Sequence, residues 1–287
     1  MFYPKPPAFD NLRAQQICVF PAIFIWAGTG YANAMSIRIG IAGISGRMGI
    51  YLAQEAAAAA TLSGGTSRSG MAPPGASHFA DITALARESD VVIDFTHAST
   101  VQDHAKALAQ TETPWVLGTT GYNQADEAAI AAAAKTIPVI AAANFCTGVN
   151  LLLLLAEKLG HALPASQYDA EILEMHHRQK VDAPSGTALA IGHAVAAGRG
   201  VALADVIVSG RDGHTGPRQD GEIGFATLRG GQIIGSHTLS FTAGDEQISL
   251  THHAFDRKVF ASGAVRAALW VHAQPAGLYG MKDFLKL

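Results

Sequence analysis

A short stretch near the start of the regular pattern restricts the fold of this chain more than any other. An apolar strand at residues 37–42 runs into the turn Gly43-Ile44-Ser45-Gly46-Arg47-Met48-Gly49, and an alanine-rich helix follows to about Ala60. Glycines at a strand-to-helix turn let the backbone approach a pyrophosphate, which then lies on the helix N-terminus. The turn therefore predicts a dinucleotide site. The predicted contacts are Gly43, Ile44, Ser45, Gly46, Arg47 and Met48.

Strands and helices continue to alternate after this turn. Further strands are predicted at residues 62–66, 90–96, 114–117 and 137–145. Right-handed crossovers between such units give a parallel sheet covered on both faces, and ligands bind beyond the carboxyl ends of its strands. We therefore expect a Rossmann-like domain. Its cofactor crevice should be lined by Thr96, Gly118, Thr119, Thr120, Ala142, Ala143, Asn144 and Phe145.

The end of the second strand indicates which nucleotide is preferred. NAD-selective folds place an acidic residue there to hold the ribose 2′-hydroxyl, but this chain has Ser67 followed by Arg68. The missing carboxylate removes repulsion toward a 2′-phosphate, and a guanidinium offers that phosphate a bidentate partner. NADPH is therefore the preferred cofactor by hypothesis, with NADH as the alternative.

The segment 171–188 carries the most chemistry per residue. Its first half alternates like a strand, so Glu174 and His176 should share one face, and His177 should point the other way. Ser185 is a candidate N-cap for the helix that follows, and free N–H groups at such a terminus favour an anion. Together with Lys180, these groups predict a site for a small carboxylate whose reaction needs a proton.

A metal site is the competing interpretation of the His176-His177 pair. The nearest cysteine, Cys146, is far away in sequence, and no His-x-x-x-His or Cys-x-x-Cys spacing accompanies the pair. The sequence therefore favours a site without a metal. A surface histidine pair and an ordinary helix start are the remaining alternatives.

The pattern changes after Gly148. Helices are expected at residues 150–159 and from Ser185 to about Ala197, and strands of antiparallel character at residues 206–209, 222–228, 232–242 and 247–253. Turns at Gly230-Gly231 and Gly244-Asp245 should join the later strands. The polar loop 210–220 is either a lid or a plain solvated loop. An apolar helix at residues 262–272 should pack back on the first domain.

These patterns predict an α/β protein of two domains. Residues 35–147 and 257–287 should form the dinucleotide-binding domain, and residues 148–256 an α+β substrate-binding domain. The chain crosses twice between them, and such crossings can act as hinges.

Residues 1–34 differ from the rest of the chain. An apolar run and Ala32-Asn33-Ala34 fit a secretory leader, whereas a start at Met35 would make these residues a poorly ordered extension. We favour the extension and a cytoplasmic protein, because a nucleotide cofactor would be scarce outside the cytoplasm. Two cysteines, Cys18 and Cys146, fit a reducing compartment. With 15% charged residues and a net charge of −3, neither nucleic acid nor a membrane is an expected partner.

Several segments together match a known family. The segment Glu171-Ile172-x-Glu174-x-His176-His177-x-x-Lys180-x-Asp182-Ala183-Pro184-Ser185-Gly186-Thr187-Ala188 resembles the signature of the 4-hydroxy-tetrahydrodipicolinate (dihydrodipicolinate) reductase family. The other matching segments are Gly46-Arg47-Met48-Gly49, Asp94-Phe95-Thr96, Gly118-Thr119-Thr120-Gly121, Ala143-Asn144-Phe145, Gly148-Val149-Asn150 and Phe260-Ala261-x-Gly263-Ala264.

The resemblance implies a function and an assembly. It implies NAD(P)H-dependent reduction of 4-hydroxy-tetrahydrodipicolinate, a cyclic imine dicarboxylate, in bacterial diaminopimelate and lysine synthesis. In this family His176 would be the proton donor and Lys180 a second donor and carboxylate partner. The substrate would be held by His177, Ser185, Gly186 and Thr187. The resemblance also implies an open mixed sheet in the second domain and a homotetramer assembled through it. Ser67 stands where many relatives carry an acidic residue, and Cys146 stands where relatives often have a serine.

Two other functions remain as rivals. The segment around Cys146 is faintly similar to the nucleophile loop of semialdehyde dehydrogenases, in which a thiolate forms a thioester. Cys146→Ser would abolish that activity and leave a reductase nearly unchanged. A catalytically silent NADPH sensor is the second rival, which would bind NADPH without consuming it.

Overall fold

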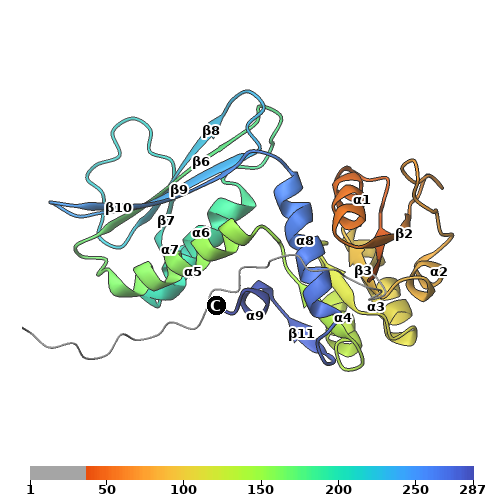
Figure 1. Cartoon of the computed structure of the whole chain (residues 1–287). Coiled ribbons are helices and arrows are strands. Elements are labelled where there is room, and N and C mark those ends of the chain that lie inside the picture. The colour runs from red at the N-terminus through yellow and green to blue at the C-terminus, as the bar shows by residue number, and fades with distance from the viewer. Residues whose placement is uncertain (1–36) are drawn as a thin grey trace, which may run out of the picture. The chain divides into compact units, whose positions relative to one another are not determined.

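The structure is a computed structural model that describes residues 37–287. The expectations for residues 1–34 lie outside the described residues. The described part contains one all-parallel sheet and one mixed sheet, each covered by helices (Figure 1). The predicted α/β class is confirmed, with a Rossmann-like first sheet and a mixed second sheet.

The first sheet has six parallel strands in the order β11-β5-β4-β3-β1-β2. Its strands are β1 (Arg38–Ala42), β2 (Thr61–Thr66), β3 (Val91–Asp94), β4 (Trp115–Leu117), β5 (Pro138–Ala141) and β11 (Gly277–Tyr279). The helices between and after them are α1 (Arg47–Ala59), α2 (Ile82–Arg87), the 3-10 turn η1 (Ala98–Thr100), α3 (Val101–Gln110), α4 (Gln124–Ala133), α8 (Lys258–Val271) and α9 (Met281–Leu285). The sequence pattern missed α2, α9 and β11, which are short.

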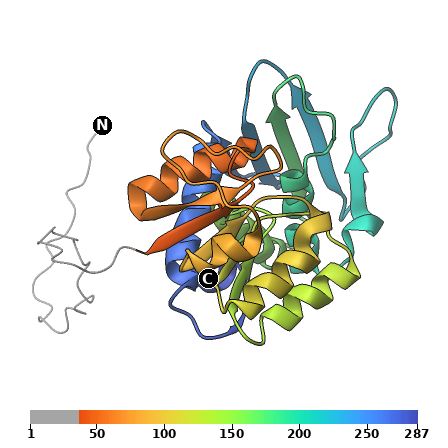
Figure 2. The same cartoon turned by 90° about the vertical axis from the view of Figure 1, so that its right-hand side faces the viewer.

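Helices cover both faces of this sheet, as a buried parallel sheet requires. Side chains from α1 and α8 form one apolar core with β1, β3 and β4, whereas α2, α3 and α4 form another core on the opposite face. Figure 2 shows α1 and α8 on one side of the sheet and α3 and α4 on the other. Both cores hold the strand ends in place, which fixes where the following loops begin.

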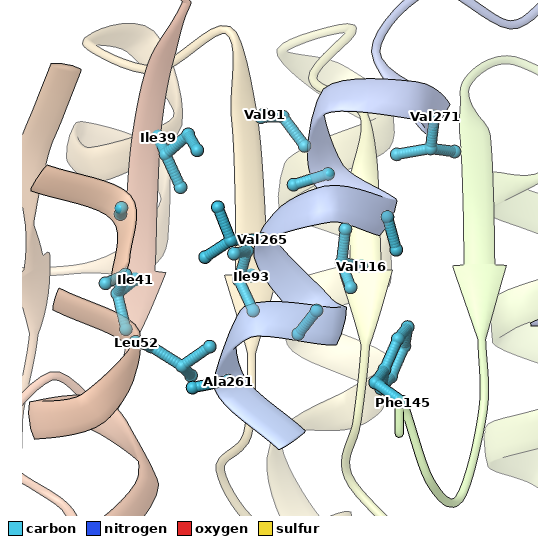
Figure 3. Close-up of a cluster of buried hydrophobic side chains, with 14 of the residues drawn as sticks. Ile39, Ile41, Leu52, Val91, Ile93, Val116, Phe145, Ala261, Val265 and Val271 are labelled. Atoms are coloured by element: carbon cyan, nitrogen blue, oxygen red, sulfur yellow. The ribbon is translucent and has the colours of Figure 1, made fainter. Parts of the chain in front are cut away.

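The C-terminal helix α8 returns to the first sheet, as its apolar sequence predicts. Its residues Ala261, Val265 and Val271 are buried against Ile93 and Val116 of the sheet (Figure 3). Burying a side chain of this size stabilises the fold by about 1.5–3 kcal/mol. The chain segment after the second sheet therefore belongs to the core of the first one.

The second sheet has five strands in the order β10-β9-β6-β8-β7. Its strands are β6 (Asp169–His176), β7 (Ile207–Ser209), β8 (Ile223–Arg229), β9 (Gly235–Thr242) and β10 (Gln247–Ala254). The helices of this region are α5 (Thr147–Ala162), α6 (Gly186–Arg199) and α7 (Leu203–Val206). Apolar side chains of α5 and α6 pack on one face of the sheet, and alternate residues on its other face, such as Leu173 and Leu228, are exposed.

The expected antiparallel pairing is only partly correct. The pairs β6–β9 and β9–β10 are antiparallel, with the predicted turn at Gly244-Asp245, but β7–β8 and β6–β8 are parallel. The predicted hairpin at Gly230-Gly231 is wrong, because β6 lies between β8 and β9. Gly230 N–H donates to the carbonyl of His176 at 2.9 Å, so the chain passes around the end of β6. The alternation of apolar and polar residues shows which face of a strand is buried. Which strands pair with it depends on long-range packing.

The loop 210–220 is tied to the sheet by two arginines. Arg218 pairs with Asp169 at 2.7 Å and with Glu171 at 3.0 Å, and Arg211 pairs with Glu171 and Glu222 at 3.1 and 3.0 Å. Glu171 lies on the face of β6 opposite His176. The anchored loop therefore does not cover His176 of its own chain, and the solvated-loop alternative fits this conformation better than the lid.

Candidate functional site

The glycine-rich turn between β1 and α1 has the geometry of an anion cradle. Gly43 has a φ of +81°, and a Cβ added at Gly49 would lie 2.2 Å from the Gly43 carbonyl oxygen. No side chain caps α1, whose N-cap is Gly46, whereas the side chains of Asp81, Asn123 and Ser185 cap α2, α4 and α6. The first N–H groups of α1 therefore remain free for a ligand's phosphate, and the residues present fit a dinucleotide.

The end of β2 lies next to this turn. The Oγ of Ser69 is 3.4 Å from that of Ser45 and 3.3 Å from that of Ser67, and the side chain of Arg68 is exposed. The predicted residues of the turn and of the second strand thus come together. Ser69 was missed by the sequence reasoning, although it directly follows Ser67-Arg68 in the same loop.

The ends of β3 and β4 are joined by the buried carboxylate of Asp94. It accepts hydrogen bonds from Thr96 Oγ1 at 2.6 Å and from Thr119 Oγ1 at 3.4 Å, and His104 Nδ1 lies 2.7 Å from its other oxygen. The Phe95 and Phe145 rings are 5.7 Å apart. The strand-end residues predicted for the crevice therefore gather at one edge of the sheet. No local motif indicated His104, which comes from the middle of α3.

A second group of side chains gathers around Glu174 on β6. The Glu174 side chain is fully buried, and Arg229 donates to both of its oxygens at 2.9 and 3.0 Å. The Ser185 N–H and the Thr227 hydroxyl each donate to Oε1 at 3.1 Å. Burial would raise the pKa of Glu174, but the hydrogen bonds and charges of Arg229 and His176 outweigh it and hold that pKa below its ordinary value. Glu174 is therefore an ionised carboxylate inside the protein.

His176 is bound directly to this carboxylate. Its Nδ1 lies 2.5 Å from Glu174 Oε2, so Nδ1 carries the proton and Nε2 is the nitrogen left for a ligand. A Cβ added at Gly235 would lie 3.1 Å from His176 Nε2, so a side chain there would crowd that nitrogen. Burial, the largest effect, lowers the pKa of His176, and the hydrogen bond to Glu174 opposes that effect. Protonated His176 is therefore a better proton donor than a solvated histidine.

Cations lie on the solvent side of this group. Lys180 forms an ion pair with Asp182 at 2.8 Å, and its charge also lowers the pKa of His176. Arg257 Nη2 lies 3.5 Å from His177 Nε2. Lys180 therefore places a positive charge near His176, and Arg257 places another beside His177, which favours a bound anion.

The N-terminus of α6 forms as the sequence predicts. Ser185 is its N-cap, with its Oγ accepting from the Ala188 N–H at 3.2 Å. Gly186 is exposed and Thr187 is half-buried, so the backbone at this helix start is accessible. Ser185 also bonds Glu174 through its own N–H, which ties the helix start to the strand that carries His176.

The start of α5 contacts the second sheet. Cys146, the N-cap residue of α5, follows Phe145 directly, and its Sγ lies 3.3 Å from His252 Nε2 on β10. Cys146 is buried. This contact ties the segment that follows Phe145 to β10 of the second sheet.

Sequence reasoning missed Arg229 and His237, and it gave Glu174 no role. Arg229 ends β8 beside His176 in a parallel register, and His237 lies opposite Glu174 in an antiparallel one. A histidine on the otherwise apolar inward face of its strand was the available signal for His237. Arg229 carried none, because its partner strand could not be identified from the local pattern.

We expect His237 to make stability depend on pH. Burial, with the neighbouring His176 adding to it, lowers the pKa of His237 from 6.5 to about 4. Between these two pKa values the unfolded chain therefore binds more protons than the folded protein does. The contribution of His237 to the free energy of unfolding is complete above the unfolded-state pKa and is lost as the pH falls through the folded-state pKa. It amounts to about 3 kcal/mol.

Urea unfolding of the wild type and of His237→Gln between about pH 7 and about pH 4 measures this contribution. The free energy of unfolding should fall more steeply with acid in the wild type, because glutamine does not titrate. Parallel curves for the two proteins would contradict the expectation.

Residues 37–287 contain neither a metal-binding cluster nor a membrane-spanning helix. In this range no group of three or more His, Cys, Asp or Glu side chains is placed to hold a metal ion. None of the helices in the same range is long and apolar enough to cross a membrane.

The chain is similar to known proteins over nearly all of its described length. Residues 37–145 match the family model described as dihydrodipicolinate reductase, N-terminus, and residues 148–285 match the one described as its C-terminus. A 4-hydroxy-tetrahydrodipicolinate reductase of Granulibacter bethesdensis is 62% identical over 253 residues, covering 87% of this chain and 97% of that protein. The reductase of that name in Acidiphilium cryptum is 63% identical over 256 residues, covering 89% and 100%.

A solved structure is also similar. The dipicolinate-bound dihydrodipicolinate reductase from Paenisporosarcina sp. TG-14 has a TM-score of 0.70 at 25% identity, and the match covers 87% of this chain and 99% of that one.

Proposed function

Because the chain belongs to the dihydrodipicolinate reductase family, we propose that it reduces 4-hydroxy-tetrahydrodipicolinate to tetrahydrodipicolinate and that His176 supplies the proton. It is an oxidoreductase of diaminopimelate and lysine biosynthesis that uses a pyridine nucleotide. The observation that carries the role of His176 is its bond to the buried, ionised Glu174 beside the N-terminus of α6.

The substrate is a dicarboxylate, and the second group of residues suits one. The free N–H groups at Gly186 and Thr187 would receive one carboxylate, with Ser185 holding the helix start in place. Lys180 and Arg257 supply positive charge for the substrate's anionic groups, and His177 would hold the substrate beside them. The relative from Paenisporosarcina was solved with dipicolinate, which has the same two carboxylates on a ring.

Proton transfer is the step that this chain's side chains perform. His176 donates from Nε2, while Glu174 holds Nδ1 and stabilises the imidazolium before transfer. Arg229 keeps Glu174 ionised, so Glu174 does not compete for the proton. Lys180 is the second donor in this proposal.

The nucleotide would be held by the first group. The residues proposed to contact it are Gly43, Ile44, Ser45, Gly46, Arg47, Met48, Ser67, Arg68, Gly118, Thr119, Thr120, Ala142, Ala143, Asn144 and Phe145. When bound, the reduced nicotinamide supplies the hydride. The uncapped N-terminus of α1 is the structural feature that fits its pyrophosphate.

We also propose that NADPH is preferred over NADH. The exposed Arg68 and the neighbouring Ser45, Ser67 and Ser69 offer a cation and hydroxyl groups to a 2′-phosphate. Arg68→Ala should therefore raise the KM for NADPH by about 10- to 100-fold and leave the KM for NADH nearly unchanged, since a charged hydrogen bond contributes about 1.5–3 kcal/mol.

Steady-state kinetics with both nucleotides measure this effect, and Arg87→Ala, a change of another exposed arginine, is the matched control. Equal changes for NADPH and NADH in Arg68→Ala would remove the assignment.

The domain limits and the assembly remain proposals. We propose a nucleotide-binding domain of residues 35–147 and 257–287, a substrate domain of residues 148–256, and a cytoplasmic homotetramer. The exposed face of the second sheet, which carries Leu173 and Leu228, supports assembly through that sheet. Sedimentation of the purified protein tests the tetramer, and a monomer would exclude it.

One assay tests the proposed reaction. Purified protein is given NADPH and freshly generated 4-hydroxy-tetrahydrodipicolinate, and nucleotide oxidation and product are followed together. Substrate-dependent oxidation supports the reductase. NADPH binding without consumption would support the silent sensor instead.

A further inference from the structure

His237 is a buried histidine to which the mechanism above assigns no role. It lies on β9 opposite Glu174 of β6 and is 4% exposed. Its Nε2 lies 3.1 Å from Ser185 Oγ, and its buried Nδ1 has no hydrogen-bond partner in the described part of the chain. An imidazole in such a place is costly to bury, which suggests that it is kept for its contacts.

His237, Ser185, Glu174 and His176 contact one another in a closed circuit. Glu174 binds His176 Nδ1 at 2.5 Å and the Ser185 N–H at 3.1 Å. Ser185 binds His237, and the His237 ring meets the His176 ring edge-on, with centroids 5.1 Å apart and an angle of 70°. His237 therefore touches both the N-cap of α6 and the donor imidazole.

Burial above all, together with the charges around His237, keeps its imidazole neutral. His176 on β6, His252 on β10 and Lys180 all disfavour a positive charge there, and Glu174 is the anion that opposes them. Ser185 Oγ already accepts from Ala188, so its hydroxyl proton is free to go to Nε2 of a neutral His237. This assigns the ring proton of His237 to Nδ1 from the hydrogen-bond network.

We propose that His237 is a positioning residue that couples carboxylate binding at the N-terminus of α6 to the orientation of His176. The inference rests on the proposed function and deepens it. His237 acts through Ser185 on the helix start and through ring contact on the donor, and it does not itself transfer the proton. Its loss should therefore affect substrate binding and turnover together and leave nucleotide binding unchanged.

Three replacements separate this role from simple filling of space. Glutamine can place a polar atom near the position of Nε2, asparagine is too short to reach Ser185, and leucine fills the space without any acceptor. His161→Leu is the matched control, since His161 is exposed near the end of α5 and belongs to neither group of the site. If His237 only filled space, His237→Leu should keep more activity than His237→Gln. If His237 positions its neighbours, His237→Gln should keep more activity than His237→Leu.

The measurements are kcat, the KM for substrate, the Kd for dipicolinate by calorimetry and the Kd for NADPH. His237→Leu and His237→Asn should each lower kcat by about 10- to 100-fold and weaken dipicolinate binding, as misplacement of catalytic groups does. His237→Gln should recover most of both, and the Kd for NADPH should stay at the wild-type value in all variants.

Two results would overturn the inference: wild-type kcat and dipicolinate affinity in His237→Leu, or equal losses in His237→Gln and His237→Asn. If His237→Leu does not fold, the comparison of glutamine with asparagine decides. Failure of the proposed function is seen separately, as a wild type that consumes no NADPH with substrate. In that case the order of dipicolinate affinities still tests His237.

Discussion

Replacing His176 with alanine should lower kcat by about two to four orders of magnitude, the usual contribution of a positioned general acid. The reason is that His176 Nε2 is the free nitrogen of a ring held by the buried Glu174. The affinity for NADPH should stay close to the wild-type value, because the proposed nucleotide contacts come from the first sheet and its loops. Rapid single-turnover kinetics and NADPH titration measure the two quantities.

The matched control is His161→Ala, which removes an exposed imidazole near the end of α5. Circular dichroism of each variant checks that the fold is retained. If His176→Ala kept wild-type turnover, the proton would have to come from another group, and Lys180 would be the next residue to replace.

Arg229→Met should destabilise the protein by about 3–5 kcal/mol, because it leaves the fully buried Glu174 carboxylate without its cation. Removing one partner of a buried ion pair leaves the other charge buried without a partner. This lowers the free energy of unfolding by more than the intact pair contributes to it. Turnover should fall as well, since the unpaired Glu174 would take up a proton more readily and hold His176 less firmly. Urea unfolding at neutral pH measures the stability.

Arg211→Met is the control for this experiment. Arg211 pairs with Glu171 and Glu222, but the Glu171 side chain is 39% exposed, and such exposed pairs contribute about 1 kcal/mol or less. Adding Glu174→Gln to Arg229→Met should recover part of the lost stability, because no charge is then stranded. Equal losses in Arg229→Met and Arg211→Met would show that the buried pair does not stabilise the fold as proposed.

The local chemistry of both sites could be predicted from consecutive residues. Gly43 and Gly49 allow the close turn before α1, and the period of two along β6 places Glu174 and His176 on the buried face. Ser185 caps α6 as its residue type predicts. Each of these features depends on backbone geometry within a few residues, so the sequence pattern contains it.

The partners of these residues could not be predicted in the same way. Arg229 and His237 reach Glu174 and Ser185 across strands that are neighbours only in space, and the parallel pairing of β6 with β8 contradicted the expected hairpin. Likewise, His104 contacts Asp94 from the middle of α3, where no motif marks it. The order of strands in a sheet is decided by which apolar faces bury together, and local alternation is compatible with more than one order.

The sequence alone therefore determined the parallel first sheet, the glycine-rich turn before α1 and the face of β6 that carries His176, because periodicity, glycine conformation and helix capping act over a few residues. Only the tertiary structure decided how His176 is held: by a carboxylate buried at 0% exposure, which is balanced by an arginine from one neighbouring strand and adjoined by a histidine from the other. Burial and pairing of charge depend on what the rest of the chain packs around them, and that information is spread over the whole fold.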